Sequence, residues 1–255
     1  MIKFINKSSE INGNTIDECL KIHHSIKIKG GENLFKNRRR TTVTCVKTQF
    51  NGNSFELCIK EVRNPGIFIK FKELFRKSRG RKAWEAAKFL EGKKIPIPSK
   101  IALLEEKDFI FPKRSFFITE FIPDSTSLFQ YIEDHLKKNL KRKRDLINAL
   151  AKFITDLHRK DICHYDLQTR NILVKENNDK WEFFLLDLES IKLNKMINRK
   201  IILKNLVELN DLPLGISRRD RIYFLKKYQE ISGISLKKKD IEEVQRISKK
   251  RQEKS

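Results

Sequence analysis

The feature that most constrains the fold is a change in hydrophobic periodicity near the middle of the chain. Before residue 120 most apolar residues alternate with polar ones, as in half-buried strands, whereas later they recur every three or four residues, as in amphipathic helices. The strand-like segments are residues 41–50, 54–62, 101–106 and 115–121, with one helix-like segment at 71–91. The later helix-like segments are residues 128–138, 143–159, 199–210, 218–232 and 237–250, with a short hairpin pattern at 172–187. A run of strands with one helix, followed by a run of helices, predicts an α+β fold in two parts.

The length of 255 residues suffices for one two-part domain with a sizeable core. We expect an N-terminal extension of unassigned role at residues 1–35, a strand-rich part at 36–122, and a helical part at 123–255 that ends in a basic helix. Between the first two expected strands, Asn51-Gly52-Asn53 is a strong signal for a tight hairpin turn.

The chain is strongly basic, with a formal net charge of +23. Such a charge attracts nucleic acid, anionic membrane surfaces or phosphorylated ligands. The basic residues are spread along the whole chain, which fits equally well a general lysine enrichment without any partner. Local clusters stand out at residues 38–40, 76–82, 141–144 and 237–254.

The cysteines and the apolar segments indicate the compartment. The four cysteines form no C-x-x-C pair and have no ligand-spaced histidine, so we expect a reducing compartment with neither zinc nor disulfides. The N-terminus does not resemble a signal peptide, and no stretch approaches the roughly 18 apolar residues of a membrane span. We therefore expect a cytoplasmic protein, soluble or peripheral at the inner face of the membrane.

Residues 164–171 carry the pattern H-x-D-L-x-x-x-N, and Asp187 follows Asn171 by 16 residues at the end of an apolar run. Average residue usage makes this pattern a chance event on the order of once in a thousand chains of this length. Phosphoryl transfer needs a carboxylate that orients the acceptor hydroxyl and takes its proton, and oxygen ligands that hold a hard cation such as Mg²⁺ against the phosphates. The spacing is that of kinases, with Asp166 as the catalytic base and Asn171 and Asp187 as metal ligands. His164 is expected to brace this loop.

A lysine that meets the phosphate oxygens completes such a site. Lys60 lies near the end of the second expected strand, on the face opposite Leu57 and Ile59. We therefore expect Lys60 to bind the phosphates of a nucleoside triphosphate.

Several segments resemble, in order, those of the lipopolysaccharide-core Kdo/heptose (WaaP-like) kinases of the protein-kinase-like superfamily. They are residues 58–62, 82–87, 95–98, 117–123, 187–189, 205–210 and 217–221. The resemblance implies a two-lobed protein-kinase-like fold, with a small antiparallel-sheet N-lobe that carries one main helix and a helical C-lobe. It also implies ATP and Mg²⁺ or Mn²⁺ as cofactors, and backbone contacts from Glu120, Phe121 and Ile122 to adenine. The implied acceptor is a hydroxyl of Kdo or heptose in the lipopolysaccharide core, and the basic clusters suit a phosphorylated glycolipid at an anionic membrane face.

The sequence departs from the family pattern around the phosphates. No G-x-G-x-x-G precedes Lys60, so phosphate coverage has to come from another loop, for which residues 38–42 are the candidate. The helix glutamate that would pair with Lys60 is not identified, and Glu85 and Glu73 remain alternatives.

The loop around Asp166 departs from the family as well. Tyr165 stands where the lipopolysaccharide kinases usually have glycine, and Gln168 replaces a common lysine. Losing that cation removes charge stabilisation from the transition state unless Arg170 supplies it. These changes bear more on the acceptor than on the reaction.

Three alternatives remain open. A protein Ser/Thr kinase of the same fold would phosphorylate itself or a partner. A nucleotide-binding pseudokinase or scaffold fits the missing glycine-rich loop, although Asp166, Asn171 and Asp187 argue against it. A nucleic-acid-binding protein fits the charge alone, and since no nucleic-acid motif accompanies that charge, nucleic acid is not the expected partner.

Overall fold

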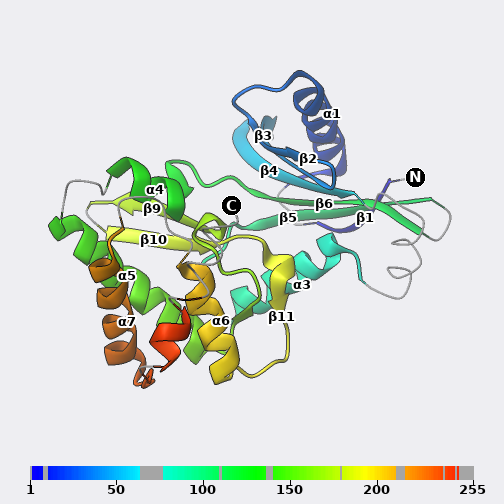
Figure 1. The fold of residues 1–255 in the computed structure, drawn as a ribbon. Coiled ribbons are helices and arrows are strands. Elements are labelled where there is room, and N and C mark those ends of the chain that lie inside the picture. The colour runs from blue at the N-terminus through cyan, green and yellow to red at the C-terminus, as the bar shows by residue number, and fades with distance from the viewer. Residues whose placement is uncertain are drawn as a thin grey trace. The chain divides into compact units, whose positions relative to one another are not determined.

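The computed structural model describes the backbone of residues 2–7 and, beyond it, residues 11–63, 77–108, 111–135, 140–178, 180–210, 216–237, 239–244 and 246. The chain forms two compact units (Figure 1). Unit 1 comprises Met1–Lys88 and Pro98–Pro123, and unit 2 comprises Phe89–Ile97 and Asp124–Ser255. The segment Phe89–Ile97 belongs to unit 2, where the Leu185 N–H donates to the carbonyl oxygen of Pro96 at 3.1 Å.

Unit 1 is built on a six-stranded antiparallel sheet with the strand order β1-β5-β6-β4-β3-β2. In that order the strands are Ile2–Lys7, Lys100–Asp108, Phe111–Glu120, Asn53–Arg63, Thr41–Phe50 and Leu34–Arg38. The hairpin of β3 and β4 turns at Asn51 and Gly52, which both have positive φ (50° and 77°), so Phe50 pairs directly with Asn53. Asn-Gly suits such a turn because both residues tolerate this conformation, and the turn sets the register of the hairpin.

One face of this sheet is covered by helix α1 (Gly13–Lys29) (Figure 1). Ile16 and Cys19 of α1 join Leu57 and Ile59 of β4 in a buried apolar cluster. The Asn12 side chain caps the start of the helix by accepting a hydrogen bond from the Thr15 N–H at 2.8 Å. Residues 1–35, which sequence analysis left as an extension, thus contribute a strand and a helix to unit 1.

Helix α3 (Arg79–Gly92) packs against the opposite face of the sheet. The Trp84 ring meets that of Phe117 edge to face at a centroid distance of 6.4 Å. The helix approaches the strands so closely at Gly80 that an added Cβ would lie 2.9 Å from Leu103 Cδ1 and from Ser115 Cβ. Phe117 pairs with Lys60 across the β4–β6 ladder, so Lys60 lies on the α3 face, as the alternation predicted.

Unit 2 is mainly helical. Its long helices are α4 (Leu128–His135), α5 (Leu140–Arg159), α6 (Arg199–Leu209) and α7 (Arg218–Ser232). Two small antiparallel sheets accompany them: β7 (Ser125–Ser127) with β9 (Ile172–Asn177) and β10 (Lys180–Leu185), and β8 (Cys163–His164) with β11 (Ile191–Lys192). The short helices η1 (Thr169–Asn171) and η2 (Leu188–Ser190) follow β8 and β10.

The predicted α+β architecture is confirmed, and most of the expected elements that the structure describes begin and end within a few residues of their expected bounds. The elements β1, α1 and β2 were not predicted, and α3 begins at Arg79, later than the expected start at residue 71. Residues 64–76, which include Glu73 and the expected start of the first helix, lie outside the described residues, as does most of the basic tail. None of the helices in the described part of the chain is both long and apolar enough to cross a membrane.

Candidate active site

The loop that contains Asp166 lies within unit 2, between β8 and η1. It leaves α5 through Asp161, which adopts the left-handed conformation (φ 58°) and accepts a hydrogen bond from the Ile197 N–H at 2.9 Å through Oδ1. This bond fixes the start of the loop to the segment that precedes α6.

The Asp166 carboxylate is oriented by two side-chain amides. Gln168 Nε2 donates to Oδ1 at 2.9 Å, and Asn171 Nδ2 donates to Oδ2 at 3.0 Å. Asn171 Nδ2 also donates to the Asp166 carbonyl oxygen at 2.9 Å. Because each oxygen accepts from a side-chain amide, the carboxylate is held in one orientation. The contact between Gln168 and Asp166 was not foreseen from the sequence.

His164 is fully buried beneath this loop. Its Nε2 donates to the Leu186 carbonyl oxygen at 3.0 Å, and its Nδ1 accepts from the Asp166 N–H at 3.2 Å. Burial lowers the pKa of His164, so the ring is neutral and carries its proton on Nε2. His164 therefore has the bracing position expected from the sequence.

Leu186 connects this loop to Asp187. Its carbonyl oxygen accepts from His164, and its N–H donates to the Asn171 carbonyl oxygen at 2.9 Å. The next residue, Asp187, is left-handed (φ 57°, ψ 44°), and its Oδ2 accepts from Ser190 Oγ at 3.2 Å. The structure thus brings together the three residues that the motif singled out: Asp166, Asn171 and Asp187.

A buried polar chain behind the loop was not foreseen from the sequence. Asn205 of α6 donates through Nδ2 to the His164 carbonyl oxygen at 2.5 Å and accepts through Oδ1 from His158 Nε2 at 3.2 Å. His158 Nδ1 then accepts from the Tyr228 hydroxyl at 2.7 Å. Burial lowers the pKa of His158 to about 4 and raises that of Tyr228 to about 12, so both are neutral. These hydrogen-bonded side chains connect α5, α6 and α7 to the backbone of the loop.

Cations gather around Tyr165, the residue before Asp166. Lys195 Nζ donates to the Tyr165 hydroxyl at 2.5 Å, and Lys204 Nζ donates to the Tyr165 carbonyl oxygen at 2.9 Å. Lys192, Lys195 and Lys204 place their ammonium groups 5.8, 5.2 and 4.6 Å from the ring centroid. Two lysines therefore bind both ends of the residue that replaces glycine.

Arg170, which the sequence offered as a replacement for the missing lysine, stacks its guanidinium on the Phe129 ring at 3.7 Å. This stacking holds Arg170 against α4. Because the guanidinium already has this contact, we do not assign to Arg170 the charge that Gln168 lacks.

Lys60 belongs to unit 1, at the pair position opposite Val43 of β3 and Phe117 of β6. Ala83 and Ala87 of helix α3 are buried. Glu85, one alternative for the glutamate that would pair with Lys60, forms an ion pair with Lys77 at 2.7 Å. The family's lysine–glutamate pair is therefore not assigned through Glu85.

Glu120, Phe121 and Ile122 also belong to unit 1, where the chain leaves β6. The Glu120 N–H donates to the Ser99 carbonyl oxygen and the Phe121 N–H to that of Glu56, both at 2.8 Å. The ring of Phe121 stacks on Phe35 of β2 at 6.0 Å. The backbone of this stretch is thus held against both β4 and the start of β5.

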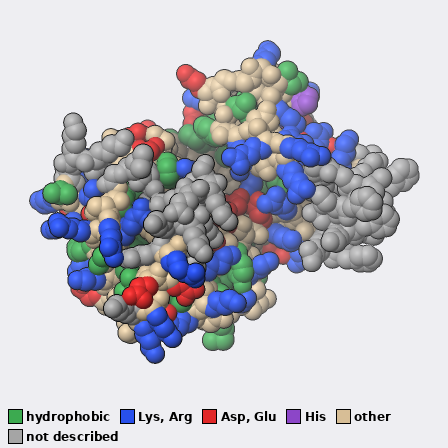
Figure 2. Space-filling view, viewed as in Figure 1, with side chains coloured by type: hydrophobic (Ala, Val, Ile, Leu, Met, Phe, Trp, Pro, Cys, Tyr) green, Lys and Arg blue, Asp and Glu red, His purple; other side chains and the backbone are tan. Residues whose placement is uncertain are grey.

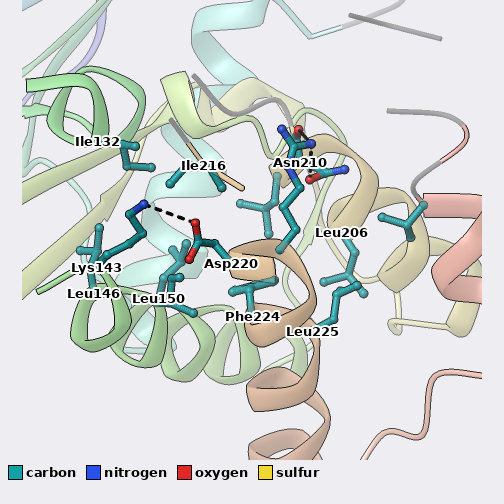
Figure 3. Close-up of a pocket in the computed structure, with 14 residues that line it drawn as sticks. Ile132, Lys143, Leu146, Leu150, Leu206, Asn210, Ile216, Asp220, Phe224 and Leu225 are labelled. Atoms are coloured by element: carbon teal, nitrogen blue, oxygen red, sulfur yellow. Dashed lines mark hydrogen bonds and ion pairs between the residues drawn. The ribbon is translucent and has the colours of Figure 1, made fainter. Parts of the chain in front are cut away.

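A cavity of about 60 Å³ lies between α5, α6 and α7 (Figure 3). Its apolar walls include Leu146, Leu150, Leu206, Phe224 and Leu225. At its polar edges Lys143 pairs with Asp220 at 3.3 Å, and Arg221 Nη1 donates to Asn210 Oδ1 at 3.0 Å. None of the residues that line it belongs to the loop 161–171, so the cavity is separate from the candidate catalytic residues.

The donor set for a metal ion is an amide oxygen and a carboxylate. With its Nδ2 directed at Asp166, Asn171 presents Oδ1 as its remaining side-chain atom, and Asp187 adds carboxylate oxygens. Oxygen ligands of this kind suit Mg²⁺, which keeps several waters and needs only one or two carboxylates with the substrate phosphates. Within the described ranges, no group of three or more His, Cys, Asp and Glu side chains is placed to hold a metal. The residues present therefore fit a magnesium ion held together with a phosphate ligand.

The positive charge is not confined to one site. Figure 2 shows Lys and Arg side chains over much of the visible face. The described structure pairs several of them with carboxylates, as in Lys47–Glu56 and Lys160–Asp156, both at 2.7 Å. Much of the charge is thus spread over the surface.

Comparisons with known proteins agree with one another. Residues 35–228 match the model of a family described as "Lipopolysaccharide kinase (Kdo/WaaP) family". The chain is 24% identical over 156 residues to the lipopolysaccharide core heptose(I) kinase WaaP of Pseudomonas aeruginosa, and 28% identical over 133 residues to the 3-deoxy-D-manno-octulosonic acid kinase of Mannheimia succiniciproducens. These matches span 58% and 52% of each protein's length, and the same shares of this chain.

A solved structure, "WaaP in complex with acyl carrier protein", superposes with a TM-score of 0.59 at 19% identity, over 90% of this chain and 92% of that one. This match shows that the fold is protein-kinase-like, as the sequence resemblance implied.

Proposed function

The chain belongs to the lipopolysaccharide kinase (Kdo/WaaP) family, and we propose that it transfers the γ-phosphoryl group of ATP to a sugar hydroxyl of a lipopolysaccharide core. The observation that carries this proposal is the geometry around Asp166. The carboxylate is oriented by Gln168 and Asn171, and Leu186 ties Asp187 to the same loop. Phosphoryl transfer requires a carboxylate that accepts the proton of the acceptor hydroxyl, together with an amide and a second carboxylate as metal ligands.

In this proposal Asp166 orients the acceptor hydroxyl and takes its proton. The hydroxyl oxygen forms a bond to the γ-phosphorus while the bond from that phosphorus to the bridging oxygen of ADP breaks. The protein contributes position and charge, because the reaction needs little covalent help. His164 and the Asn205 chain behind it hold the loop in place.

Lys60 binds the triphosphate from unit 1. Asn171 and Asp187 would hold a magnesium or manganese ion, which when bound neutralises phosphate charge. Adenine contacts are assigned to Glu120, Phe121 and Ile122. Since the N–H groups of Glu120 and Phe121 already donate within unit 1, these two residues would contact adenine through their carbonyl oxygens.

The acceptor class rests on the relatives. One is named as a heptose kinase and the other as a kinase of 3-deoxy-D-manno-octulosonic acid, and both sugars offer hydroxyl groups. The structural neighbour is named in complex with an acyl carrier protein, and we extend that partner class to this chain as part of the proposal. Co-elution of the chain with acylated and unacylated carrier protein tests the partner separately from turnover.

The test is ATP turnover with Mg²⁺ or Mn²⁺, with and without purified lipopolysaccharide core, for the wild type, Asp166→Ala and Asp156→Ala. Asp156 is a matched control, because it lies in unit 2 and pairs with Lys160 on the exposed side of α5. We expect Asp166→Ala to lower turnover by about 10²–10⁴-fold while ATP still binds, and Asp156→Ala to match the wild type.

Each outcome selects one activity. Turnover that needs both Asp166 and the core sugar supports the proposal. Turnover that needs Asp166 but no sugar indicates a protein kinase. Nucleotide binding without turnover under any condition indicates a pseudokinase, and the absence of nucleotide binding overturns the proposal.

A further inference from the structure

The turn between β2 and β3 carries three consecutive arginines. Arg38 pairs with Thr41, so Arg39 and Arg40 form a two-residue turn between the strands. These are the two strands that precede the Lys60 strand, the place where protein kinases carry the glycine-rich loop that covers the phosphates. This chain has no glycine between Gly31 and Gly52, so a loop of that kind cannot form here.

Arg63 anchors the turn from β4. Its guanidinium donates to the carbonyl oxygens of Arg38 at 2.5 Å and Arg39 at 3.2 Å, and its backbone N–H donates to that of Arg40 at 2.9 Å. Arg63 Nη1 is held in turn by the buried Glu61 carboxylate at 2.8 Å. All three carbonyl groups of the turn are therefore satisfied within unit 1, and the turn is ordered without glycine.

The register places Arg38 of this turn on the Lys60 face of the sheet. Directly paired residues point to the same face, and Lys60 pairs with Val43 of β3. Thr41 is two residues along β3 from Val43 and pairs with Arg38, so Arg38 shares that face. Two strand spacings across and two residues along put the Cα atoms of Arg38 and Lys60 roughly 12 Å apart. Their long side chains can converge on one polyphosphate across that span.

All three arginines are exposed. Three adjacent cations on one turn repel one another, and a polyanion would relieve that repulsion. Guanidinium groups bind phosphate oxygens in a forked geometry that suits a nucleotide.

We propose that the Arg38–Arg40 turn binds the phosphate groups of the nucleotide, with guanidinium side chains in place of the backbone N–H groups of a glycine-rich loop. Arg63 is a positioning residue, because it acts on the turn and not on the phosphates. This inference rests on the proposed use of ATP and adds a second phosphate-binding group to Lys60.

The experiment measures the affinities of ATP and adenosine, with Mg²⁺ present, for the wild type and for Arg38→Ala/Arg39→Ala/Arg40→Ala. We expect ATP to bind about 10- to 100-fold more weakly to the triple variant, and adenosine to bind within about twofold of the wild type. The triple lysine substitution at the same three positions retains the charge but not the forked guanidinium geometry. Its affinity for ATP should lie between those of the wild type and the triple alanine variant.

A matched control removes the same charge elsewhere in unit 1. Lys21→Ala/Lys29→Ala/Lys107→Ala changes three exposed lysines outside the proposed site. It should leave both affinities unchanged. Should the alanine variant fail to fold by circular dichroism, Arg39→Gln/Arg40→Gln keeps polar side chains on the turn and should show the same selective loss of ATP affinity.

The outcomes separate this inference from the proposed function. If the wild type binds ATP and the triple alanine variant binds it equally well, the role of the turn is overturned but the proposed function is not. Equal weakening of ATP and adenosine, or an equal effect of the lysine control, also overturns it, because the effect would then not depend on phosphates at the turn. Wild type that binds neither ligand overturns the proposed function and this inference with it.

Arg63 has its own readout. Arg63→Lys keeps the charge beside Glu61 but loses the fork that holds two carbonyl groups of the turn. We expect it to raise the KM for ATP about three- to tenfold with kcat nearly unchanged. An unchanged KM would exclude positioning by Arg63.

Discussion

Glu61 is a buried carboxylate, and removing its charge should weaken the attachment of α1 to the sheet of unit 1. Its side chain is 1% exposed and accepts from Arg63 Nη1 at 2.8 Å and Lys27 Nζ at 2.9 Å. Arg114 Nη1 lies 3.3 Å away and His23 Nε2 3.6 Å away. Burial alone would raise the pKa of Glu61, but the nearby His23 ring, the hydrogen bond from Lys27 and the charge of Arg63 hold that pKa well below its usual value. The perturbation is Glu61→Gln, which keeps the shape and removes the charge.

The magnitude follows from what the cations can do after the change. Breaking a buried ion pair by removing one partner costs about 3–5 kcal/mol, because a charge is left without compensation in a poorly solvated site. The three cations around Glu61 remain partly exposed, with 22%, 21% and 28% of the side-chain surface of Lys27, Arg63 and Arg114 accessible to solvent. Each can therefore turn partly toward water. We therefore expect the lower end, a loss of about 3 kcal/mol in the free energy of unfolding.

Urea-induced unfolding at neutral pH measures this loss, and Glu56→Gln is the matched control. Glu56 lies on the same strand and pairs with Lys47 at 2.7 Å, but the two side chains are 33% and 69% exposed. Exposed pairs of this kind contribute about 0–1 kcal/mol. Equal effects of the two substitutions would refute the reasoning, because burial of Glu61 would then add nothing.

Two further predictions concern the polar chain behind the loop. Asn205→Leu leaves the His158 Nε2–H and the His164 carbonyl oxygen without partners, so we expect the free energy of unfolding in urea to fall by about 2–5 kcal/mol. Tyr228→Phe removes a single donor, so we expect a loss of only about 1–2 kcal/mol. Equal losses would contradict this ordering. His158 has a pKa of about 4 in the folded protein and about 6.5 in the unfolded chain, so the unfolded chain binds more protons between these pH values. The free energy of unfolding should therefore fall by up to about 3 kcal/mol as the pH drops from 6.5 to 4. His158→Asn should flatten that part of the pH profile in thermal melts, and an unchanged slope would show that His158 is not its source.

Local signals explain what the sequence predicted well. Asn51-Gly52 indicated the turn that sets the register of β3 and β4, and alternation along β4 placed Lys60 on the face opposite Leu57 and Ile59. The spacing of Asp166, Asn171 and Asp187 in the sequence predicted that they lie close together. They do so because backbone atoms of Leu186 form hydrogen bonds with His164 and Asn171. Such features depend on residues close in sequence or on a fixed spacing.

Helix α1 was missed because its buried residues are not all apolar. They are Thr15, Ile16, Cys19 and His23, and two of these four are polar. His23 is buried because Thr44 Oγ1 lies 2.7 Å from its Nδ1 and Glu61 is near its Nε2. These partners are distant in sequence, so the apolar spacing of Ile16, Cys19, Leu20 and Ile26 did not explain why His23 lies on the buried face.

The same limit applies to the groups that support the active-site loop and the Arg38–Arg40 turn. Asn205 lies 41 residues from the His164 carbonyl group that it contacts, and Arg63 lies 25 residues from the Arg38 carbonyl group. Backbone carbonyl acceptors leave no mark in the sequence. Their partners therefore look like ordinary polar residues until the fold brings them together.

The segment Phe89–Ile97 belongs to unit 2 although it is made before the rest of that unit, and this order has a consequence for folding during synthesis. The N–H group that binds the Pro96 carbonyl oxygen belongs to Leu185, which follows Pro96 by 89 residues. At roughly 5–20 residues per second, a ribosome needs on the order of 5–20 s to supply that donor. During this interval the segment emerges without its final neighbours, while Pro98–Pro123 completes the sheet of unit 1. A fragment that begins at Asp124 would lack the segment altogether, and should recover the missing strand-end contact only when a peptide of residues 89–97 is added in trans.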